Sequence, residues 1–242
     1  MLPGVTLVTI PGSALNKDSK ITTTGLSIPF TGLRKQYNQL RTEILDATDI
    51  VLRSGNLMNG NATAEFEHWL ARKNNQRYAV TCHSGTHALE AIAAYYYRAS
   101  NHVPRVLIPT MTYAATVNAF VREGWDVTLI HCNGQGLLNL ASLDNVVDFD
   151  MAVIVGLYGA SILKMGDIKY WPMRTVFNSN TVWIEDAAQH WLANDCQRYG
   201  DAAAISFDPM KNLANFGNGG AIVTNSKFMY DYLTPMINNG KP

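Results

Sequence analysis

A lysine shortly after a buried apolar segment is the residue of this sequence with the most distinctive chemistry. Lys211 follows the apolar segment 202–207 and precedes the glycine-rich segment 217–220. In a partly desolvated pocket, a lysine amine loses its proton more easily and becomes a nucleophile for an aldehyde. A solvated loop lysine is the alternative, and it is the commoner case for a lysine taken alone.

A small-residue turn offers a place for an anion. Ser84, Gly85 and Thr86 stand between the apolar segment 78–82 and a helical pattern. Free backbone N–H groups at the start of a helix attract anions such as phosphate. An ordinary helix N-cap by Ser84 or Thr86 explains the same residues, so both interpretations stay open.

Two further positions follow apolar segments. Asp186 comes after Glu185 at the end of segment 181–185. A carboxylate there costs free energy unless it meets a cation or hydrogen-bond donors, so Asp186 either caps a helix or faces a protonated ligand group. Tyr113 follows segment 105–109 and offers an aromatic face to a planar ligand, although core packing is the commoner role for such a ring.

A metal site is the competing interpretation of the turn after residue 82. His83 and His87 are four residues apart, and Cys82 is adjacent. A third and a fourth ligand at usable spacing are missing, and the same segment fits a phosphate turn. The sequence therefore predicts no metal.

The composition argues against a nucleic-acid-binding protein, a membrane protein and a disulfide-rich protein. Lysine and arginine total 19 against 19 for aspartate and glutamate, so the chain lacks the basic field that nucleic acid or an anionic membrane requires. No apolar segment approaches the roughly 18 residues of a membrane helix. Cys82, Cys132 and Cys196 are too widely spaced for a disulfide framework. We expect a cytoplasmic protein that binds neither nucleic acid nor membrane.

The elements that must position these residues alternate along the chain. Helical periodicity covers residues 33–53, about 65–73, 86–97 and about 113–123. Seven short apolar segments predict strands at 78–82, 105–109, 127–132, 152–157, 181–185, 202–207 and 220–224. This order predicts an α/β fold, a three-layer αβα sandwich with a mostly parallel seven-stranded sheet. The close spacing of the last two strands allows one antiparallel strand.

Residues 1–27 show no sustained period and predict a loosely ordered extension before a domain over 28–242. Ligands of parallel sheets bind at the carboxyl ends of the strands, which is where the segments described above fall.

Several segments, taken in order, resemble the DegT/DnrJ/EryC1/StrS sugar aminotransferases, which are fold-type-I enzymes dependent on pyridoxal phosphate. They include Ile28-Pro29-Phe30, Ser84-Gly85-Thr86-His87, Pro109 to Thr116, Leu157-Tyr158-Gly159, Glu185 to Gln189, Ser206-Phe207, Lys211-Asn212-Leu213 and Gly219-Gly220-Ala221. Single motifs are weakly specific, but this many in the family's order are specific. The resemblance covers essentially residues 28–242.

The resemblance implies a role for each site residue. Lys211 holds the cofactor as a Schiff base and then moves protons as general base and acid, while Asp186 pairs with the ring nitrogen. The residues that contact the rest of the cofactor are Gln189 at the phenolic oxygen, Tyr113 on the ring, and Gly85, Thr86 and Ser206 at the phosphate. The implied substrates are a nucleotide-linked keto sugar and glutamate or glutamine as amino donor, in a homodimer whose sites lie between subunits. Lys211 favours transamination, because a few members carry histidine at this position and dehydrate instead.

The sequence also departs from the family pattern. Gly156 stands where many relatives have histidine, Trp191 where glycine is frequent, and Asn218 where aspartate is common. Relatives continue beyond residue 242 into a C-terminal small domain, which we expect to be absent here, with low activity for this chain alone. Two alternatives remain: a cofactor-binding or subunit-interaction protein without turnover, and a related sugar dehydratase or lyase.

Overall fold

The structure is a computed structural model that describes residues 20–23, 26–145, 148–161, 181–192 and 200–240. The chain forms two compact units, one that ends at Arg53 and one that starts at Ser54. The predicted N-terminal extension lies mostly outside the described residues. Within it, β1 (Lys20–Thr23) pairs antiparallel with β2 (Leu26–Pro29). The helix α1 (Leu33–Ser54) follows, as the periodicity predicts.

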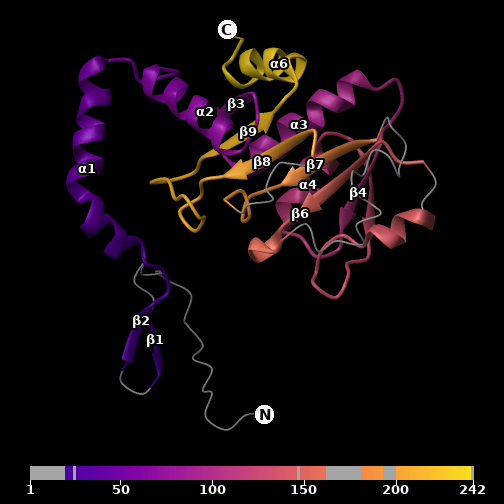
Figure 1. Ribbon diagram of the computed structural model, residues 1–242, viewed down its shortest axis with the longest axis horizontal. Coiled ribbons are helices and arrows are strands. Elements are labelled where there is room, and N and C mark those ends of the chain that lie inside the picture. Colours follow the sequence, from indigo (N-terminus) through magenta and orange to yellow (C-terminus); the bar gives the residue numbers. More distant parts are fainter. Residues whose placement is uncertain (1–19, 24–25, 146–147, 162–180, 193–199, 241–242) are drawn as a thin grey trace. The chain divides into compact units, whose positions relative to one another are not determined.

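A seven-stranded sheet forms the centre of the second unit (Figure 1). Its strands are β3 (Tyr78–Cys82), β4 (Arg105–Pro109), β5 (Asp126–Ile130), β6 (Met151–Val155), β7 (Val182–Asp186), β8 (Ala202–Ser206) and β9 (Gly220–Thr224). Each lies within two residues of its predicted bounds. The mostly parallel seven-stranded sheet is therefore confirmed.

The spatial order of the strands is β3-β9-β8-β7-β6-β4-β5. Only β9 runs antiparallel to its neighbours, β3 and β8, which confirms the one antiparallel strand that the sequence allows. In the parallel part, Val155 is in register with Asp186, so β6 and β7 end side by side.

Helices cover both faces of the sheet, which confirms the three layers. On one face lie α3 (Gly85–Ala99), α4 (Ala114–Arg122) and α6 (Lys227–Ile237), and α2 (Asn61–Lys73) contributes to the core of the other face. Residues of β6 alternate between the two cores, because successive side chains of a strand point to opposite faces. Short 3-10 helices occupy Leu140–Asn145 and Leu157–Gly159.

The sequence did not predict α6. Its start carries a helix signal, since Ser226 caps it by accepting a hydrogen bond from the N–H of Met229 at 3.2 Å. Met229 and Leu233, four residues apart, are its fully buried residues.

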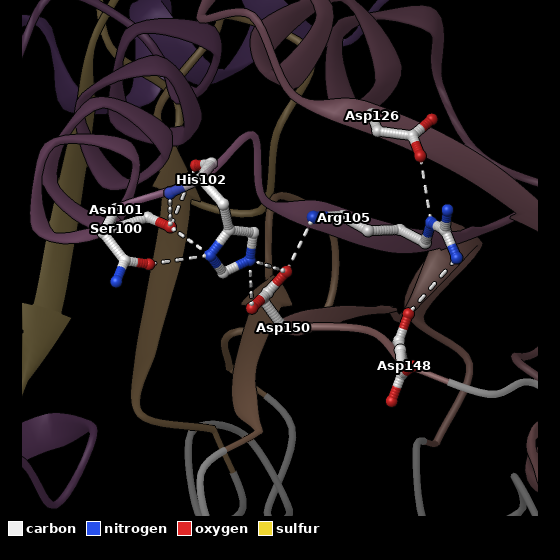
Figure 2. Close-up of polar contacts among 7 residues, drawn as sticks. All are labelled: Ser100, Asn101, His102, Arg105, Asp126, Asp148 and Asp150. Carbon is white, nitrogen blue, oxygen red and sulfur yellow. Dashed lines mark hydrogen bonds and ion pairs between the residues drawn. The ribbon is translucent and has the colours of Figure 1, made fainter.

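A polar network joins the amino ends of β4, β5 and β6, at the edge opposite the predicted site (Figure 2). Asp150 accepts the backbone N–H of Arg105 at 2.8 Å and lies 3.1 Å from Nε2 of His102. The side chain of Arg105 donates from Nε to Asp126 at 2.9 Å and also reaches the carbonyl of Asp148 at 3.3 Å. The network thus holds three strand starts in register.

Candidate functional site

One pocket of about 460 Å³ lies at the carboxyl ends of the central strands. Its lining includes every site residue that the sequence predicts: Gly85, Thr86, Tyr113, Asp186, Gln189, Ser206 and Lys211. These residues span more than 120 positions of the chain and come from the ends of four strands, β3, β4, β7 and β8. The parallel arrangement of the strands brings them to one edge.

The start of α3 forms one wall of the pocket. Ser84 is the N-cap, and its Oγ accepts the N–H of His87 at 3.0 Å. A Cβ added at Gly85 would lie 2.8 Å from Cβ of Ser206, so only glycine allows β8 to approach the helix start this closely. Ser84 caps the helix, while Gly85 and Thr86, the first two residues of the helix, line the pocket. The N-cap role of Ser84 is therefore compatible with an anion at the same helix start.

Asp186 forms the floor and is 7% exposed. Its Oδ2 accepts the hydroxyl of Thr116 at 2.6 Å, and its Oδ1 accepts the N–H of Ala188 at 3.2 Å. Thr112 in turn lies 2.7 Å from the Thr116 hydroxyl. Among the ion pairs of the described residues, none involves Asp186. The carboxylate is therefore buried with hydrogen-bond donors and without a cationic partner in that part of the chain.

Lys211 lies half-buried in a turn after β8. Its backbone N–H donates to the carbonyl of Asp208 at 2.8 Å, and the N–H of Met210 donates to the Asp208 carboxylate at 2.8 Å. The next residue, Asn212, donates from its side chain to the carbonyl of Gln189 at 3.2 Å. This contact ties the turn that carries Lys211 to the turn that follows β7.

A residue in the segment after β6 also contacts Gln189. Its Oε1 accepts the backbone N–H of Tyr158 at 2.6 Å, which leaves the amide NH₂ to donate elsewhere. Tyr158 has φ of 58°, a left-handed conformation that is uncommon outside glycine. The exposed rings of Tyr113 and Tyr158, both pocket-lining, stand at its rim.

Two residues that contact predicted site residues, Thr116 at Asp186 and Tyr158 at Gln189, were given no role from the sequence. Thr116 stands four residues after Thr112, a spacing that places both hydroxyls on one side of a helix start. Tyr158 belongs to the Leu157-Tyr158-Gly159 motif, where a glycine after an aromatic residue signals a tight turn.

The histidine pair beside the pocket is close but incomplete as a metal site. The rings of His83 and His87 lie 5.5 Å apart, and burial and the charge of His83 lower the pKa of His87. Burial raises the pKa of the Cys82 thiol to about 12, and its Sγ donates to the carbonyl of Ser84 at 3.3 Å. Within the described residues, no group of three or more histidine, cysteine, aspartate or glutamate side chains is arranged to hold a metal.

The three departures from the family pattern lie in or beside the site. Gly156 and Asn218 line the pocket. Trp191 is buried behind it, with its ring 5.9 Å from that of Phe207. Separately, none of the helices described here is both long and apolar enough to cross a membrane.

The chain is similar in sequence to several known proteins. A family model described as the DegT/DnrJ/EryC1/StrS aminotransferase family matches residues 38–242. The chain is 28% identical over 209 residues to a pleiotropic regulatory protein of Geobacillus stearothermophilus, covering 83% of this chain and 54% of that protein. It is 29% identical over 209 residues to GDP-perosamine synthase of Escherichia coli O157:H7, covering 83% and 52%.

Among solved structures, the chain is similar to DesV of S. venezuelae, determined in complex with a ketimine intermediate. The TM-score is 0.77 at 27% identity, and the match covers 88% of this chain and 58% of that one. The chain spans about half the length of the curated relatives it matches.

Proposed function

Because the chain belongs to the DegT/DnrJ/EryC1/StrS aminotransferase family, we propose that it serves as a pyridoxal-phosphate-dependent aminotransferase. The proposed reaction moves an amino group from glutamate or glutamine to a nucleotide-linked keto sugar. The observation that carries the proposal is the convergence of all seven predicted residues, Lys211 and Asp186 among them, on one pocket.

The start of α3 fits the phosphate of this cofactor. Gly85 and Thr86 present backbone N–H groups at the positive end of a 15-residue helix. The hydroxyl of Ser206 lies beside them, because the missing side chain at Gly85 lets β8 approach the helix start closely. These donors suit a doubly charged anion without requiring a basic side chain.

Asp186 fits the protonated ring nitrogen. A buried carboxylate costs free energy unless a cation or several donors meet it. Thr116 and Ala188 already donate to Asp186 from the protein side, so the face toward the pocket remains for an N–H of the ligand. Asp186 thereby holds the proton on the ring nitrogen.

Gln189 and Tyr113 orient the ring. The Tyr158 contact turns the amide of Gln189 so that its NH₂ is the group left for a ligand oxygen. Tyr113 lies at the rim and offers its face to a planar ring.

Pyridoxal phosphate, when bound, supplies an aldehyde that bonds to amines and an electron-poor ring that accepts the electrons released when a neighbouring C–H bond breaks. Nζ of Lys211 is the group proposed to bond to that aldehyde. With pyridoxal phosphate bound, the same amine would be placed to take a proton from one carbon atom and to return it to another. The connection between Asn212 and Gln189 keeps this amine beside the ring-binding residues.

The substrate class rests on the relatives. GDP-perosamine synthase and a UDP-N-acetyl-3-dehydro-α-D-glucosamine 3-aminotransferase match this chain at 29% and 28% identity. Their names refer to nucleotide sugars, which supports a substrate of that class here. A homodimer and a cytoplasmic location belong to the same proposal and rest on the family resemblance and the wide spacing of the cysteines.

The test is a visible absorbance spectrum of the purified chain with added pyridoxal phosphate, beside Lys211→Ala, before and after glutamate is added. We expect a band that requires Lys211 and that glutamate converts to the spectrum of the aminated cofactor. A Lys211-dependent band that neither glutamate nor glutamine changes would favour the binding-only alternative. Absence of any band would contradict the proposed site.

A further inference from the structure

A buried histidine lies directly behind the wall of the pocket. The side chain of His190 is fully buried, and the residue follows Gln189 in the chain. Gly156 lines the pocket just after β6. A Cβ added at Gly156 would lie 2.2 Å from Nδ1 and 2.4 Å from Cγ of His190. The imidazole thus occupies the space where a side chain at position 156 would begin.

The other side of the ring contacts a buried carboxylate. Nε2 of His190 lies 3.3 Å from Oε2 of Glu185, whose side chain is also fully buried. The second carboxylate oxygen accepts the N–H of Gly200 at 3.1 Å. Glu185 immediately precedes Asp186 in β7, so this pair fastens the turn that follows the strand back onto the strand itself.

The turn that follows β7 contains Gln189, and the segment that follows Gly156 contains Tyr158, the hydrogen-bond partner of Gln189. The N–H of Tyr158, two residues beyond Gly156, donates to Oε1 of Gln189 at 2.6 Å. The imidazole therefore lies between the two segments that meet at Gln189. Its size sets the separation of these segments.

The free ring nitrogen shows that packing and the Glu185 contact define the position of the ring. Within the described residues, Nδ1 of His190 is buried and has no hydrogen-bond partner. The ring is therefore held in place by the contact with Glu185 and by the space that the missing side chain at Gly156 leaves, and no second hydrogen bond to the described residues contributes.

We infer that His190 is a positioning residue for the pocket, acting through Gln189, and that Gly156 is its required counterpart. His190 contacts neither substrate nor cofactor in this assignment. It fixes where the Gln189 amide lies, and the glycine at position 156 leaves room for the ring. The inference concerns the site of the proposed function and rests on that function for its ligand-binding readout.

The experiment is a double-mutant cycle of Gly156→Ala, His190→Ala and the double variant. Gly134→Ala is the matched control, because a Cβ there meets nothing within 4 Å. The first readout is the dissociation constant for pyridoxal phosphate from an absorbance titration. The second is hydrogen exchange of residues 156–159 and 186–190 in the chain without cofactor, measured by mass spectrometry.

Gly156→Ala is expected to weaken cofactor binding by about tenfold or more and to speed exchange in both segments. In the His190→Ala background, the same alanine is expected to change binding by less than about twofold, because the ring it collides with is gone. Additive effects of the two changes would overturn the inference. If Gly156→Ala fails to fold, recovery of folding in the double variant supports the inference, and failure of the double variant contradicts it.

His190→Gln separates positioning from stability, because glutamine keeps a donor for Glu185 and lacks the ring. We expect it to fold, to speed exchange in both segments and to shift the pH midpoint of the Lys211-dependent band. An unchanged midpoint with unchanged exchange would contradict the inference. If the wild-type chain shows no such band, the proposed function fails, and the exchange measurements still decide the inference independently.

Discussion

The hydroxyl of Thr116 donates a hydrogen bond of 2.6 Å to the carboxylate of Asp186, across 70 positions of the chain. Thr116 is fully buried in α4, and Asp186 ends β7. This contact fixes which carboxylate oxygen faces the pocket. Without it, Asp186 keeps only the N–H of Ala188 as a donor from the described residues.

Thr116→Val is expected to weaken binding of pyridoxal phosphate by roughly tenfold or more, because a hydrogen bond to a charged group contributes about 1.5–3 kcal/mol. Valine keeps the shape and removes the hydroxyl. An absorbance titration checks this. Thr234→Val is the control, since that hydroxyl donates only within α6 to Tyr230. Equal affinities for the two variants would show that the Thr116 contact does not act on the site.

Gly85→Ala is expected to weaken binding of pyridoxal phosphate more than tenfold, because the new methyl would lie 2.8 Å from Cβ of Ser206 and push the Ser206 hydroxyl away from the helix start. Pyridoxal without phosphate is expected to lose much less affinity. Titrations with the two compounds measure the difference, with Gly134→Ala as control. A similar loss for both compounds would place the phosphate elsewhere.

Stability is expected to fall as pH rises above 9 because of Cys82. Burial raises the pKa of this thiol from 9.0 to about 12. Between these values the unfolded chain binds fewer protons at this position than the folded chain, so unfolding becomes easier by up to about 1.4 kcal/mol per pH unit. The contribution is fully present below pH 9. Denaturant midpoints across this range test the slope, which Cys82→Ala is expected to reduce; an unchanged slope would assign the dependence to other groups.

Asp150→Ala is expected to lower the free energy of unfolding by about 1–2 kcal/mol, because the half-buried N–H of Arg105 loses its acceptor. Asp126→Ala removes only the exposed ion pair to Arg105 and is expected to cost about 0–1 kcal/mol (Figure 2). Urea denaturation of both variants measures the difference. Cofactor affinity is expected to stay unchanged in both, since the network lies at the amino ends of the strands. A larger loss of stability for Asp126→Ala would show that the ion pair contributes more to stability than the hydrogen bond from the Arg105 N–H.

The sequence by itself determined the strands and most helices, and it predicted seven residues that line one pocket. Segments such as 202–207 and 220–224 are almost entirely apolar or small because both faces of a central strand are buried, and that pattern is local. Lys211, Asp186 and Gly85 follow such segments, and parallel strands carry their carboxyl ends to one edge. Their meeting in one pocket follows from these two facts.

Only the tertiary structure decided the strand order, the direction of β9 and the contacts between distant side chains. No local pattern records that Thr116 reaches Asp186, that Tyr158 holds Gln189 or that His190 fills the space beside Gly156. These relationships depend on distances between segments far apart in the chain, which are set by packing of the whole sheet. The periodicity of a segment shows which face of a helix or strand is buried, but which element packs against that face depends on the whole fold.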